Sequence, residues 1–168
     1  MVYHGPPVNT AKIVYVARDA GISKGAGLDP TQISADLFVR YGNNAAAGAF
    51  NVPAGIYNGT SGWLANKPTV AKFVNRAAPT AGNTDAKVVV VKPGKLAKLT
   101  GKSLGDVTLD LEGAGDPGTQ GVSTVFRVTN GAETKRHCSH FADCSYKVFG
   151  GSAGAKLVCR LGAAAICP

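Results

Sequence analysis

Acidic residues are scarce in this sequence, and glutamate is almost missing. The 168 residues include 10 Asp and Glu against 18 Lys and Arg, and glutamate occurs only at Glu112 and Glu133. There is one Met and one Trp, and the charged fraction is 17%, below the roughly 25% of an average domain. Because glutamate and methionine are scarce and Val, Thr and Gly dominate the periodic stretches, the composition argues against a helix-rich domain and favours strands joined by turns.

Long apolar runs are missing as well. No stretch of 18 apolar residues is present, so the sequence predicts no membrane insertion. Residues 1–10 contain no apolar signal core, and we expect a flexible segment there or the artificial start of a piece cut from a longer secreted protein. Residues 11–168 are expected to form one β-rich domain, because this length fits a single core.

The signatures of common enzymes are also missing. There is no nucleophile elbow and no dinucleotide fingerprint, and residues 21–27 (GISKGAG) lack the Gly-Lys-Ser/Thr ending of a phosphate loop. No Cys-x-x-Cys pair marks a zinc ribbon or a redox site. We therefore predict a non-catalytic protein that needs no cofactor.

The sequence does contain an even number of cysteines, all at one end of the chain. Their number and spacing favour two disulfides, and hence an oxidising compartment, over a metal site. Spacing alone leaves three pairings open. The four residues are Cys138, Cys144, Cys159 and Cys167.

A net charge of +8 brings nucleic acid, anionic polysaccharide and acidic membranes into consideration as partners. The basic residues are scattered, however, and we interpret their densest group as a solvated face. The sequence therefore predicts no nucleic-acid partner and leaves a polysaccharide open. This densest group consists of Lys87, Lys92, Lys95 and Lys98.

Alternation of apolar and polar residues predicts about ten to twelve short strands. Residues 86–92 (AKVVVVK) should form a central strand, because they are short, β-branched and bounded by turn residues. Residues 121–129 (GVSTVFRVT) should turn at Asn130-Gly131 into a hairpin. Other strands are expected at 11–17, 35–41, 45–52, 70–74, 95–100 and 107–111, with a last hairpin at 146–149 and 155–160. The predicted fold class is all-β, an antiparallel β-sandwich or an irregular barrel.

Several short segments form an ordered pattern along nearly the whole chain. They are Lys12–Arg18, Ala26–Pro30 (AGLDP), Leu37-Phe38, Ser61-Gly62-Trp63, Val90–Leu99 (VVKPGKLAKL), and Cys138 with the closing Cys167-Pro168. This order resembles a β-rich domain that occurs, often in tandem, in large secreted or surface proteins of bacteria whose roles are uncharacterised. The resemblance implies a secreted, extracellular or cell-surface location and like domains as partners. It implies no activity, because none of these residues is catalytic in type.

The resemblance also implies a disulfide pattern. Domains of this kind keep cysteines like Cys138 and Cys167, whereas positions like Cys144 and Cys159 gain and lose cysteine together. The implied pairs are Cys138–Cys167 and Cys144–Cys159, one nested inside the other.

Three groups of residues are candidates for sites. His137, Cys138 and His140 (in HCSH) are metal-ligand types, but residues three apart on a strand point to opposite faces, so we predict no metal there. Carboxylates around a Gly-rich turn make a candidate calcium site, although their spacing fits no standard loop. They are Asp110, Glu112 and Asp116.

The third group is aromatic. Tyr57 and Trp63 flank one turn and could begin an exposed platform for a sugar, but core packing is the reading that we favour for them.

Three functional hypotheses follow from these features. The first is a non-catalytic structural, adhesion-type or assembly module, whose sheet edges or loops meet like modules or another macromolecule. The second is a carbohydrate-binding module, which requires Tyr57 and Trp63 to be coplanar and exposed. The third is a metal-dependent enzyme, which requires His4, His137 or His140 to converge.

Overall fold

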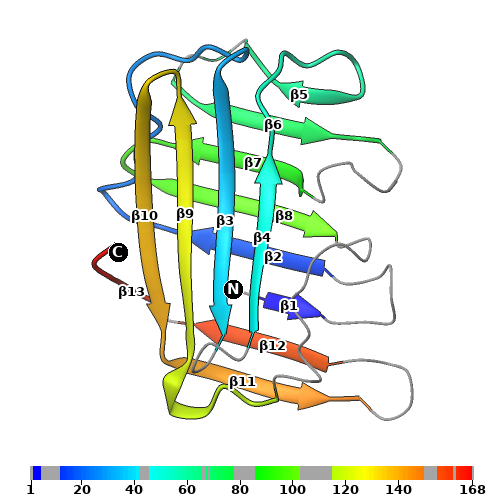
Figure 1. Cartoon of the computed structure of the whole chain (residues 1–168), viewed down its shortest axis with the longest axis vertical. Coiled ribbons are helices and arrows are strands. Elements are labelled where there is room, and N and C mark those ends of the chain that lie inside the picture. The colour runs from blue at the N-terminus through cyan, green and yellow to red at the C-terminus, as the bar shows by residue number, and fades with distance from the viewer. Residues whose placement is uncertain are drawn as a thin grey trace.

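The computed structural model describes residues 2–4, 12–41, 46–65, 67, 69–77, 86–102, 115–149, 155–160 and 162–167. They form two antiparallel sheets (Figure 1). The eight-stranded sheet has the order β11 (Asp143–Val148), β12 (Ala155–Arg160), β1 (Val2–His4), β2 (Lys12–Ala17), β8 (Leu96–Lys102), β7 (Ala86–Lys92), β6 (Ala71–Asn75) and β5 (Ser61–Trp63). The five-stranded sheet has the order β13 (Ala163–Ala164), β10 (Glu133–Phe141), β9 (Val122–Asn130), β3 (Ile33–Tyr41) and β4 (Ala46–Val52).

The two sheets face each other across one apolar core, which confirms the predicted antiparallel sandwich. Strands β3, β4, β9 and β10 run across those of the other sheet, a crossed packing rather than an aligned one (Figure 1). Tyr15 of β2 stacks on Phe126 of β9, with ring centroids 5.8 Å apart. Fully buried side chains from both sheets, among them Leu37 and Leu99, belong to the same cluster.

The alternation in sequence sets which side chains enter this core. In β9, every second residue from Val122 to Val128 is buried, as its pattern predicts. The predicted hairpin joins β9 to β10, with its turn one residue later than expected, at Gly131-Ala132; Gly131 has the positive φ of +61° that favours glycine. The predicted central strand, β7, lies between β6 and β8.

Some details differ from the expectation. Strand β10 occupies nine residues that no alternation marked as a strand, because most of its first half is exposed on both faces. Strand β1 falls inside segment 1–10, expected to be flexible, and it pairs with β2 and β12. The strand expected at 107–111 lies outside the described residues.

The disulfides are Cys138–Cys167 and Cys144–Cys159, the pairs that the resemblance implies. Cys144 and Cys159 lie directly opposite each other in the β11–β12 pair. Cys138 lies on β10 and anchors the end of the chain after β13. Two disulfides suit an oxidising compartment. Within the described ranges there is no helix with the length and apolar character needed to span a bilayer.

Candidate binding face on the five-stranded sheet

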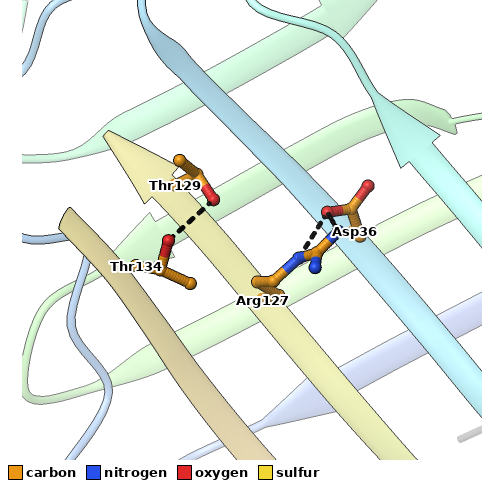
Figure 2. A network of polar contacts seen from close by, with 4 residues as sticks. All are labelled: Asp36, Arg127, Thr129 and Thr134. Atoms are coloured by element: carbon orange, nitrogen blue, oxygen red, sulfur yellow. Dashed lines mark hydrogen bonds and ion pairs between the residues drawn. The ribbon is translucent and has the colours of Figure 1, made fainter. Parts of the chain in front are cut away.

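The outer face of the five-stranded sheet carries an ion pair between neighbouring strands. Register places Asp36 of β3 opposite Arg127 of β9. The Nε and Nη2 atoms of Arg127 lie 2.8 and 2.7 Å from Oδ2 of Asp36 (Figure 2). Beside this pair, the hydroxyls of Thr129 and Thr134 lie 3.3 Å apart and link β9 to β10 (Figure 2).

This ion pair orients an aromatic ring. The Arg127 side chain is 37% exposed, so the pair itself contributes only about 0–1 kcal/mol to stability. Its guanidinium, however, lies 5.1 Å from the centroid of the Phe38 ring, within the range of a cation–π contact. Asp36 thus holds Arg127, and Arg127 covers one face of Phe38.

Phe38 belongs to an apolar row that crosses the sheet. Pairing places Ala49 of β4 and Val125 of β9 on either side of Phe38, and Cys138 of β10 follows Val125. We call Ala49, Phe38 and Val125 the apolar row. It lies in a hollow of about 640 Å³, within the volume range of ordinary ligand sites. Phe38 is 37% exposed, although it is a large apolar residue.

One wall of the hollow is formed by Ala165 and Ile166 of the C-terminal segment 162–167. β13 pairs with Ser139 and His140, and the Ala165 amide donates to the Cys138 carbonyl at 2.9 Å. The Cys138–Cys167 disulfide then holds the segment to β10. Ile166, which is 98% exposed, adds an apolar side chain to the rim.

A basic row borders the apolar row. Arg40 of β3 lies opposite Ser123 of β9, which in turn lies opposite His140 of β10. The Ser123 hydroxyl and Nδ1 of His140 are 3.0 Å apart. Arg40 is exposed and forms no ion pair within the described part of the chain. The described lining of the hollow contains Arg40 and no acidic residue, so the site combines an apolar centre with a positive border.

The aromatic pair Tyr57 and Trp63 does not form the exposed platform that a sugar would need, and this expectation is corrected. Trp63 is fully buried, packs edge-on against Phe73 with centroids 5.5 Å apart, and donates its indole N–H to the Pro53 carbonyl at 2.9 Å. Tyr57 is partly buried, and its hydroxyl donates to the Gly59 carbonyl at 2.5 Å. Core packing, the reading favoured from the sequence, is what Trp63 shows.

The two histidines of β10 lie on opposite faces of the strand. Nε2 of His137 is 3.3 Å from the Ser139 hydroxyl on the inner side, whereas His140 contacts Ser123 on the outer side. Cys138 is in a disulfide and offers no thiolate. The side chain of His4 lies outside the described part. No group of three or more His, Cys, Asp or Glu residues within the described ranges is placed to hold a metal.

The candidate calcium site is only partly described. Asp110 and Glu112 lie outside the described residues, and Asp116 is exposed and accepts the Gly118 amide at 2.9 Å. The lysine group lies on the β7–β8 hairpin, and Lys87 donates to the Ala77 carbonyl at 2.6 Å. It is separate from the hollow.

Sequence reasoning missed the binding face. Alternation along residues 35–41 puts Phe38 and Arg40 on the same face of that strand, but it gives no sign that this face is open. The only signal was a large aromatic residue on the polar side of an alternating strand. Comparison of the chain with protein-family models, with curated proteins and with solved structures gives no match.

Proposed function

We propose that the chain is a non-catalytic binding module of a secreted or surface protein, which holds another protein through the outer face of its five-stranded sheet. The observation that carries the proposal is the hollow of about 640 Å³ over the apolar row, bordered by Arg40. Exposed apolar side chains grouped in a concave surface mark interaction sites, because their burial by a partner is favourable. The two disulfides support a location in an oxidising compartment.

The apolar row and the neighbouring Arg40 specify the chemistry of the partner. An aromatic or aliphatic side chain fits the apolar row, and a carboxylate beside it fits Arg40. The ion pair of Asp36 with Arg127 is already closed, so among the described residues that line the hollow Arg40 is the cation that can meet the partner. The partner is therefore a protein segment with an apolar residue next to an acidic one. A second copy of this chain is disfavoured, because two molecules with a net charge of +8 repel each other.

Binding of four labelled dodecapeptides, measured by fluorescence anisotropy, tests the proposal. They combine a central Phe or Ser with flanking Asp or Lys residues. The Phe–Asp peptide should bind most tightly, and Phe38→Ser and Arg40→Gln should each weaken its binding by roughly five- to tenfold. Val148→Ser and Lys72→Gln serve as matched controls, because both residues are exposed on the eight-stranded sheet.

Equal binding of all four peptides, or unchanged binding by both face variants, would overturn the proposal. The alternative partner is a second copy of the chain, and sedimentation of the chain alone, which measures its oligomeric state, tests it. A dimer that Phe38→Ser dissociates would make a second copy the partner and contradict the acidic segment.

A further inference from the structure

A second hollow, of about 310 Å³, lies where the end of β2 approaches β10 and β12. Its chemistry differs from that of the binding face, since its polar lining is basic and hydroxylic. The residues that matter are Arg18, Asp19, His137, Ser139 and Arg160. Of these residues, Ser139 is shared with the lining of the binding face, and the other four are separate from it.

Two arginines face this hollow from different strands. Arg18 directly follows β2, and Arg160 is the last residue of β12. Both are exposed, and neither forms an ion pair with any residue that the structure describes. The single carboxylate in the lining, Asp19, accepts the Gly21 amide at 2.6 Å. The described lining therefore carries two guanidinium groups and one carboxylate.

Hydroxyl groups extend from the hollow into the core. Ser139 is only 6% exposed, and its hydroxyl lies 3.3 Å from Nε2 of His137. The Tyr15 hydroxyl is fully buried and has no hydrogen-bond partner of ordinary geometry among the described residues, although the Ser139 and Thr124 side chains lie near enough to influence its pKa. Buried hydroxyls are normally satisfied, so a polar cluster that is incomplete at this position is unusual for a sandwich core.

We infer that this hollow binds a tetrahedral oxyanion, a phosphate or a sulfate, between Arg18 and Arg160. Guanidinium groups match such anions through paired N–H donors, and these charge-assisted hydrogen bonds are stronger than neutral ones. Ser139 and His137 supply further polar contacts on the inner side of the hollow. At about 310 Å³ the hollow lies at the lower end of the roughly 300–1,000 Å³ range of ligand sites, so it admits an anion together with the group esterified to it.

The experiment is a calorimetric titration of the full chain with sodium sulfate and with sodium phosphate, against sodium chloride at equal ionic strength. Saturable binding of both oxyanions, but not of chloride, is expected. Arg160→Gln and Arg18→Gln should each weaken it at least tenfold. Arg76→Gln is the matched control, because Arg76 is an exposed arginine beyond β6 and does not line the hollow.

A parallel titration with a sulfated tetrasaccharide distinguishes the source of the anion. Tighter binding than inorganic sulfate, lost in Arg160→Gln, assigns the site to a sulfate ester, and equal binding assigns it to the free ion. The inference is overturned if chloride competes equally at matched ionic strength, if no saturation occurs, or if Arg76→Gln weakens binding as much as the two hollow variants do. These results are independent of peptide binding at the other face.

Discussion

The hydroxyl groups of two buried tyrosines differ in a way that stability measurements can detect. Tyr41 donates its hydroxyl to the Gly115 carbonyl, whereas that of Tyr15 has no partner of ordinary geometry among the described residues. Burial raises the pKa of both phenols, and the nearby Tyr146 and Asp116 add to the effect at Tyr41. The two residues are thus a matched pair for Tyr→Phe substitution.

Tyr15→Phe should raise the free energy of unfolding by about 1 kcal/mol at pH 8, because an unsatisfied buried hydroxyl is removed. Tyr41→Phe should lower it by about 1 kcal/mol, because a hydrogen bond is lost. Urea denaturation measures both changes. A loss of more than about 1 kcal/mol in Tyr15→Phe would show that this hydroxyl is bonded after all.

The same tyrosines predict a decline of stability in alkali. Since their folded pKa values lie above the unfolded value of about 10, the folded state retains the phenol protons more strongly than the unfolded state does, and the free energy of unfolding falls as pH rises beyond about 10. Each Phe variant should lose less stability than the parent between pH 8 and pH 11.

Two glycines with positive φ angles differ in how much space surrounds them, and substitution by alanine distinguishes the two effects. Gly121 and Gly27 have φ values of +58° and +63°, but only at Gly121 would a Cβ overlap the Phe141 carbonyl oxygen. Gly27→Ala should cost about 1 kcal/mol through conformation alone, and Gly121→Ala roughly 3 kcal/mol or more. Thermal denaturation of both variants checks this, and equal losses would contradict the close approach before β9.

At the scale of elements, the disulfides hold one edge strand of each sheet. Among the described strands, β11 lies at an edge and pairs with β12 alone, and β13 lies at an edge and makes two residue pairs with β10. Cross-links over separations of 15 and 29 residues contribute roughly 3 to 3.5 kcal/mol each in the chain-entropy model. The internal strand β7 lies far from both in sequence.

Reduction of both disulfides should therefore lower the melting temperature markedly and release the residues after Cys138 first. Hydrogen exchange should rise in β11, β12 and segment 162–167 while β7 remains protected. The double variant Cys144→Ala/Cys159→Ala separates the two cross-links, because it should leave segment 162–167 in place. Uniform loss of protection along the chain would contradict this account and show that the bridges hold the whole fold.

The elements that could be predicted from sequence are the strands with one solvent-exposed face and one buried face. β3 and β9 alternate cleanly, so Leu37 and Phe126 could be assigned to the core from pattern alone. β10 could not, because Glu133 to Arg136 are exposed and the hairpin partner, not a buried face, keeps them extended. The disulfide pairing followed from the resemblance, since spacing left three alternatives.

For the whole molecule, the binding face is assembled from segments that lie far apart in the sequence. On the five-stranded sheet, residues from β4, β3, β9 and the C-terminal segment meet around Phe38, although more than 110 positions separate Ala49 from Ile166 in the sequence. Only the register of distant strands brings them together. A single sequence contains no local sign of that register, so the binding face could not be predicted from it.

An NMR titration tests the central claim most directly, because it locates the contact rather than inferring it from variants. Labelled protein is titrated with the dodecapeptide that carries Phe and Asp. The account predicts saturable shifts at Phe38, Arg40, Val125 and Ile166, with the eight-stranded sheet unchanged. Shifts centred on the eight-stranded sheet, or none up to millimolar peptide, would contradict it.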